Sequence, residues 1–174
     1  MFCKGDRVVY PHHGAAVIED IVEREVLGTP RTYFKLRLPH GNLTIMVPVE
    51  GTEEVGLRGV VSKGDLDKVF HVLHQDEGGV PDLWSQRYKS NLAKLISGDI
   101  YRLAEVVRDL SLRDARQGVS TAERRMLAKA RQVLISELTF VVDSTEENAE
   151  AMLDEVLEES RGDLAPILGS SPSA

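Results

Sequence analysis

The sequence predicts an α+β protein: a small all-β domain followed by an all-α domain of about five helices. Residues 6–49 are rich in β-branched and aromatic residues, with Pro and Gly between the apolar runs. Beyond residue 64 the apolar residues recur at helical spacing instead. Four glycines between positions 51 and 64 separate the two patterns and mark the domain boundary.

The all-β part is predicted to contain short antiparallel strands at residues 6–10, 15–22, 32–38 and 43–49. Turns rich in Pro, Gly and His separate them. Four or five short strands in about 50 residues are typical of a Tudor- or SH3-like barrel, a class of interaction module. Pro48 lacks a backbone N–H, so the last strand is expected at an edge or bulge, where a partner could add a strand.

The chain is thus expected to divide into four parts. Residues 1–52 form the barrel, 53–63 a linker, 64–160 the helical domain and 161–174 a disordered tail. Apolar stripes predict helices over residues 66–74, 83–96, 100–116, 120–140 and 145–159. Ser120 and Glu123 have the spacing of a capping box, which places the start of the fourth helix.

Composition narrows the class of function. No run approaches the roughly 18 apolar residues of a membrane span, the N-terminus does not resemble a signal peptide, and Cys3 is the single cysteine. We therefore expect a cytoplasmic protein. No phosphate-binding loop, nucleophile triad, paired catalytic carboxylates or metal-ligand spacing is recognisable, so we expect neither an enzyme nor a cofactor nor a metal.

Charge is unevenly distributed along a chain whose net charge is −7. The segment from Trp84 to Arg131 holds eleven Lys or Arg and five Asp or Glu, which makes it net +6. The overall negative charge argues against strong independent binding to nucleic acid. A local basic segment could still contact DNA if another partner brings the protein there.

Trp84, the only tryptophan, opens this basic segment. If it shares a helix face with Tyr88 and Leu95, it is a buried core aromatic. If it lies beyond the end of that face, it is exposed beside Arg87 and Lys89, where it could press on DNA bases. Sequence pattern leaves both alternatives open.

The helix after Ser120 carries the other basic candidates. Glu123 is the only acid between residues 121 and 131, whereas the bases are Arg124, Arg125, Lys129 and Arg131. Such a run is either a solvated helix face or a phosphate-binding surface. The charge imbalance favours phosphate binding.

Several separate motifs occur in the order that one known family has them. They are GDRVVYPHHGAA at residues 5–16, LTIMVP at 43–48, VGLR at 55–58, WSQRYK at 84–89 and RMLAKAR at 125–131. Over about residues 1–160 the chain resembles the CarD (CdnL) family of bacterial transcription regulators, most closely its actinobacterial members.

The resemblance implies a role for each domain. The Tudor-like domain would bind the RNA polymerase β subunit, with Arg24 matching a polymerase-contacting arginine and Met46 standing where a basic residue is frequent. The helical domain would contact promoter DNA, ribosomal RNA promoters among others, through Arg87, Lys89 and Arg124. Trp84 would be a minor-groove wedge at the upstream edge of the transcription bubble, stabilising the open complex.

Two other functions remain compatible with the residues. The first is a protein-protein interaction adaptor that makes no direct DNA contact and has Trp84 in its core. The second is a Tudor-type reader of modified side chains, which needs an aromatic cage. Tyr10, Tyr33 and Phe34 are few and alternate in direction, so the second function ranks lower.

Overall fold

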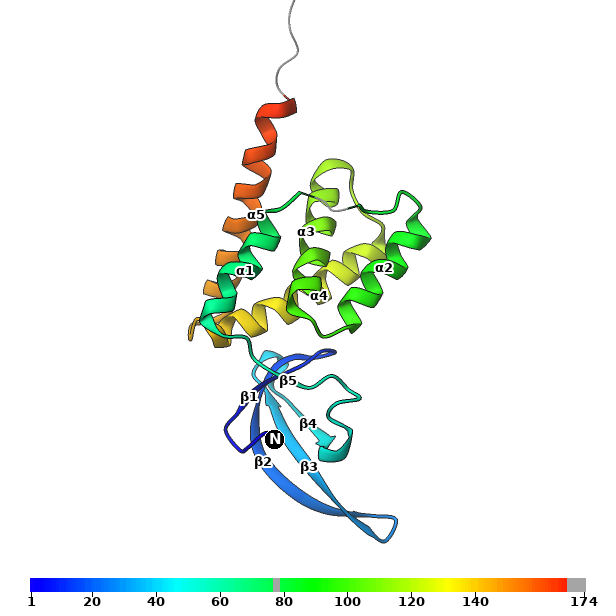
Figure 1. Ribbon diagram of the computed structural model, residues 1–174, viewed down its shortest axis with the longest axis vertical. Coiled ribbons are helices and arrows are strands. Elements are labelled where there is room, and N and C mark those ends of the chain that lie inside the picture. Colours follow the sequence, from blue (N-terminus) through cyan, green and yellow to red (C-terminus); the bar gives the residue numbers. More distant parts are fainter. Residues whose placement is uncertain (77–78, 169–174) are drawn as a thin grey trace, which may run out of the picture.

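The computed structural model of the protein describes residues 1–76 and 79–168, the last six of these by their backbone alone. A five-stranded antiparallel sheet comes first in the chain and five helices follow it (Figure 1). The two parts pack end to end, and the α+β prediction is confirmed. No helix among the described residues is both long and apolar enough to cross a bilayer.

The sheet is formed by β1 (Arg7–Tyr10), β2 (Gly14–Val26), β3 (Thr29–Leu38), β4 (Leu43–Pro48) and β5 (Arg58–Gly59). Their order is β4-β3-β2-β1-β5, so β4 and β5 are the edges. The pairing register shifts between Ile18 and Asp20, a bulge that increases strand twist. The core of this part contains Val8, Ala16, Ile18, Phe34, Leu36, Leu38, Val47 and Leu57.

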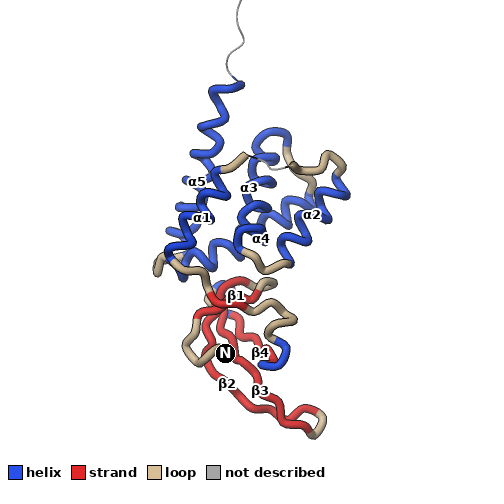
Figure 2. Tube along the Cα trace, in the orientation of Figure 1, coloured by secondary structure: helices blue, strands red, loops and turns tan. Residues whose placement is uncertain are grey.

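The β2–β3 hairpin extends well beyond this core, away from the helices (Figure 2). Its strands reach Val26 and Thr29, which leaves a two-residue turn of Leu27 and Gly28. Both turn residues have positive φ, 53° and 77°, as the type I′ turn that matches strand twist requires. Leu27 is fully exposed there, although leucine rarely adopts this conformation.

The segment expected to be a linker is partly incorporated in the sheet. β5 lies within residues 53–63 and pairs with β1, with Val9 opposite Arg58. The N–H of Val60 also donates to the Arg7 carbonyl at 3.3 Å. The expectation of a free linker is therefore wrong for residues 58–60.

The five predicted helices are all present. They are α1 (Lys63–His74), α2 (Trp84–Ile96), α3 (Ile100–Gln117), α4 (Thr121–Val141) and α5 (Glu146–Leu168). α1 begins before the expected Leu66 because the Ser62 Oγ caps it, accepting the N–H of Asp65. Their common core includes Val69, Leu73, Leu103, Val107, Leu110, Leu134, Leu138 and Leu153.

The last helix corrects the prediction of a disordered tail from residue 161. Residues 161–168 continue α5, and residues 169–174 lie outside the described residues. Gly162 and Pro166 suggested a break, yet a helix that is already packed through Leu153 and Leu157 can continue across a glycine.

α4 joins the two parts through one buried carboxylate. The side chain of Glu137 is completely buried, and Arg58 donates to its two oxygens at 2.7 Å each. The N–H of Val61 donates to the same carboxylate at 3.0 Å, and the Arg58 Nε donates to the carbonyl of Gly98. This bidentate pair fixes β5 to α4 and to the loop before α3.

A close backbone approach completes the contact between sheet and helices. A Cβ at Gly14 would lie 2.5 Å from the Ser136 Oγ, and the Gly14 φ is +99°. The adjacent N–H of Ala15 donates to that hydroxyl at 2.9 Å, and Gln132 donates to the His13 carbonyl at 3.2 Å. Only glycine allows β2 to lie this near α4.

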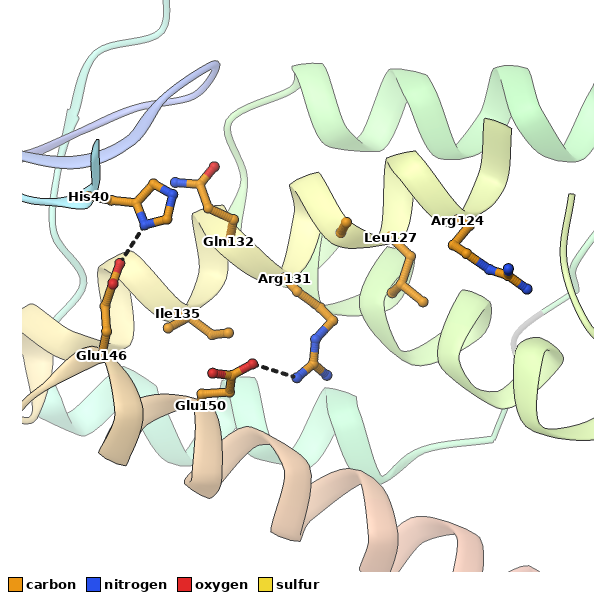
Figure 3. Close-up of a pocket in the computed structure, with 9 residues that line it drawn as sticks. His40, Arg124, Leu127, Arg131, Gln132, Ile135, Glu146 and Glu150 are labelled. Atoms are coloured by element: carbon orange, nitrogen blue, oxygen red, sulfur yellow. Dashed lines mark hydrogen bonds and ion pairs between the residues drawn. The ribbon is translucent and has the colours of Figure 1, made fainter. Parts of the chain in front are cut away.

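A cavity of about 380 Å³ opens beside this contact. Leu127, Arg131 and Ile135 of α4 line it, and His40 binds Glu146 at its end with 2.7 Å between Nδ1 and Oε1 (Figure 3). The histidine comes from the turn before β4 and the glutamate from the first residue of α5. A polar bridge thus adds to the contacts that join the sheet to the helices.

Replacing the buried carboxylate should destabilise the whole molecule. Glu137→Ala leaves the Arg58 guanidinium without its partner, so the free energy of unfolding should fall by about 3 kcal/mol. Urea unfolding followed by circular dichroism measures this change. The control is Glu19→Ala, which removes an exposed ion pair with Lys35 and should change stability little. Equal losses for the two variants would contradict a structural role for Glu137.

Candidate nucleic-acid interface

Trp84 is the first residue of α2, and α2 lies on the side of the helical domain away from α5 (Figure 1). It is 46% exposed, and its ring stacks on Tyr88 with 5.2 Å between centroids. The indole Nε1–H donates to the Ser120 Oγ at 3.1 Å. Neither alternative left open by the sequence is matched in full: the ring is partly exposed, yet it stacks on Tyr88, and Arg87 is buried.

Arg87 does not lie on the surface that the sequence predicted for it. Only 4% of the residue is exposed, and its Nε lies 2.7 Å from the Glu123 Oε1. Its Nη1 donates to the carbonyls of Pro81 and Asp82, at 3.4 and 3.2 Å, in the loop before α2. The expected phosphate contact of Arg87 is therefore corrected: its donors hold α2 and its preceding loop against α4.

Glu123 receives that arginine and also closes the capping box of α4. Its Oε2 accepts the N–H of Ser120 at 3.0 Å, and its own N–H donates to the Ser120 Oγ at 3.2 Å. Burial raises the pKa of the carboxyl, but the hydrogen bonds from Arg87 and Ser120 outweigh it and lower the pKa below 4.5. Glu123 is consequently ionised at neutral pH.

The sequence predicted the capping box but not the contacts that its two residues make with α2. Ser120 and Glu123 are three residues apart, a spacing that can be recognised locally. Their partners Trp84 and Arg87 each lie 36 positions earlier in the chain, and no periodicity links the two pairs. Only the packing of α2 on α4 brings the four residues together.

The exposed basic residues lie near this group in the chain. Arg124 and Arg125 are exposed in the first turns of α4, directly after Glu123, and Lys89 is exposed just over one turn after Trp84. Arg124 lies 3.7 Å from Asp114, a loose surface pair that leaves its guanidinium accessible. We call Lys89, Arg124 and Arg125 the exposed cations of α2 and α4.

Lys129, on the same helix, is less accessible than the exposed cations. It is half-buried, its Nζ donates to the Gln132 side chain at 3.2 Å, and burial lowers its pKa. The pKa of His13 is lowered first by burial and then by the charge of Lys129, so this lysine faces the sheet. Lys129 therefore differs in burial from the exposed Arg124 and Arg125.

The two residues predicted to bind polymerase lie at different positions along the strands of the sheet. Arg24 is exposed in the projecting hairpin, opposite Arg31 on β3. Met46 is half-buried on the edge strand β4, opposite Lys35, four residues further along β3. The hairpin also exposes Ile21, Val26 and Leu27, apolar residues that the sequence analysis did not single out.

Comparisons with known proteins agree with this division of the chain. Residues 2–61 match the family model described as the CarD-like/TRCF RID domain, and residues 68–154 match the CarD C-terminal domain. The N-terminal sheet is thus of the Tudor-like type. The chain is also similar to a putative transcription factor, YdeB, of Bacillus subtilis, with 37% identity over 146 residues. That alignment covers 84% of this chain and 95% of the relative.

The two family models follow one another in the same order as the sheet and the helices, and together they span most of the chain. The relative aligns across both parts rather than one of them. The chain belongs to the CarD family.

Proposed function

We propose that this protein is a transcription factor that docks on RNA polymerase through its N-terminal sheet and stabilises the promoter open complex through its helical domain. The observation that carries the proposal is the partly exposed Trp84 ring, in a helical domain whose α2 and α4 also carry the exposed cations Lys89, Arg124 and Arg125. An exposed aromatic ring in a domain that also presents cations suits DNA whose bases are partly unstacked.

The ring would act as a wedge in the minor groove at the upstream edge of the bubble. Inserting an apolar group between base pairs costs a few kcal/mol in intact duplex and less where stacking is already disturbed. A ligand shifts an equilibrium by its differential affinity for the two states, so a better fit to the open junction stabilises the open complex. No base-specific hydrogen bond is required.

The exposed cations of α2 and α4 would contact phosphates and so orient the helical domain on DNA. Arg124, Arg125 and Lys89 are the accessible donors. Lys129 is half-buried and would contribute less to phosphate binding. The net charge of −7 makes the protein a weak binder of free DNA. Delivery by polymerase is therefore part of the proposal.

The sheet would bind the β subunit. Exposed Arg24 and the apolar residues near the hairpin turn offer a mixed surface, with apolar contact area beside a charge-assisted donor. Met46 lies on the edge strand β4, where a partner strand could pair with the backbone. An apolar side chain there would contribute packing and not a salt bridge.

The lifetime of the open complex at a ribosomal RNA promoter tests the wedge. Wild-type protein should lengthen it, and Trp84→Ala should remove about 1–3 kcal/mol of that stabilisation, a loss of roughly five- to 150-fold. Ile96→Ala, an exposed apolar residue about three turns further along α2, is the matched control and should act like wild type. If Trp84→Ala lengthens the lifetime as wild type does, Trp84 is not the wedge. If wild type has no effect either, an adaptor function becomes the better explanation.

Affinity for the isolated β subunit tests the proposed polymerase-binding surface of the sheet. Arg24→Glu should weaken affinity about tenfold or more, because a charge-assisted hydrogen bond is replaced by a repulsive carboxylate. Arg161→Glu makes the same charge change at an exposed position of α5 and should leave affinity unchanged. Equal affinities for both variants would place the interface away from the hairpin.

A further inference from the structure

The side chain of Trp84 is held by a group of residues that contacts no ligand in the proposed function. α2 begins at Trp84, so no preceding helical turn can restrict the ring. On one side it stacks on Tyr88, and its single polar atom donates to Ser120 on another helix. The orientation of the indole therefore depends on α4 as well as α2.

Ser120 has the capacity for this contact in addition to its helix cap. A hydroxyl oxygen offers two acceptor positions. In Ser120 it accepts the Glu123 N–H at 3.2 Å and the indole N–H at 3.1 Å. Because the cap fixes the position of this oxygen relative to α4, it also fixes the atom to which the indole binds.

Glu123 and Arg87 complete a closed set of hydrogen bonds between α2 and the start of α4. One Glu123 oxygen accepts from the Ser120 backbone and the other from Arg87, at 3.0 and 2.7 Å. Arg87 lies three residues after Trp84 on α2, and Glu123 lies three residues after Ser120 at the start of α4. Two side chains from each helix therefore cross-link, and the ion pair is almost completely buried, at 4% and 1% exposed.

We propose that Ser120, supported by Glu123 and Arg87, is a positioning residue that orders the Trp84 indole before DNA arrives. The proposal rests on the proposed function of Trp84 as a wedge. Ordering a side chain on binding opposes association, and a side chain that is already ordered avoids this cost. Preorganisation would thus increase the stabilisation that the wedge gives to the open complex.

The hydrogen bond between Trp84 and Ser120 also determines which atoms of the indole are available to contact DNA. The indole N–H is a donor only, and Ser120 already engages it. The exposed part of the ring is then apolar, so it can contact any base step without a preferred acceptor. This is the property that a wedge acting at many promoters needs.

The experiment uses the full chain with the single changes Ser120→Gly, Ser120→Thr and Trp84→Phe, and a double variant that combines Ser120→Gly with Trp84→Phe. Glycine keeps most of the helix cap but removes the hydroxyl, whereas threonine keeps both. Ser62→Gly is the matched control, since the Ser62 hydroxyl caps α1 by accepting the N–H of Asp65 three residues later.

The first readout is the free protein. The chain has one tryptophan, so the indole N–H gives a single signal whose hydrogen exchange can be followed by NMR. Ser120→Gly should accelerate that exchange and increase indole mobility in fluorescence anisotropy, while Ser120→Thr and Ser62→Gly should match wild type. Unchanged exchange and mobility in Ser120→Gly would overturn the proposal whether or not Trp84 acts on DNA.

The second readout is the open-complex lifetime. Ser120→Gly should reduce the lengthening about two- to tenfold, the range for one hydrogen bond, and Ser120→Thr should restore it. In the Trp84→Phe background, which lacks the indole donor, Ser120→Gly should have no further effect. A full further effect there would overturn the proposal, because Ser120 would act through α4 alone.

Comparison with Trp84→Ala separates failure of this proposal from failure of the proposed function. If Trp84→Ala is inactive while Ser120→Gly is fully active, the wedge stands and the positioning role of Ser120 is refuted. If Trp84→Ala and wild type give equal lifetimes, the wedge itself is refuted.

Discussion

The buried carboxylate of Glu137 is the interaction on which the arrangement of the two domains depends. It lies on a helix of the C-terminal domain, yet Arg58 and the Val61 N–H, which neutralise and solvate it, come from the end of the N-terminal part. A buried carboxylate without these donors would carry a large desolvation penalty. Docking of the N-terminal part thus supplies the donors that offset this penalty.

α4 connects the sheet to the site of Trp84. Its middle and last turns contact the sheet through Gln132, Ser136 and Glu137, and its N-terminal cap holds the indole through Ser120. A continuous helix rises about 1.5 Å per residue, so about 25 Å separate Ser120 from Glu137. In the proposed function, a rigid spacer of this kind would fix where the tryptophan lies relative to a polymerase bound at the sheet.

The sequence was sufficient where local rules decide the structure, and insufficient where distant residues meet. Apolar periodicity and the Ser120 capping box located the five helices. Arg87 was expected at the surface because a basic residue in a basic segment has no visible partner, and its partner Glu123 becomes apparent only when α2 packs on α4. The length of β2 was underestimated because residues 23–26 are exposed and stay extended through pairing with β3.

Leu27, at the turn of the β2–β3 hairpin, is a residue that costs the free protein stability. Glycine or asparagine adopts a positive φ more readily, and a fully exposed leucine contributes no burial energy to folding. A sequence optimised for stability alone would place a different residue there. The hairpin turn of the isolated molecule thus exposes apolar surface to water, and covering it with a partner would recover hydrophobic free energy that folding leaves unused.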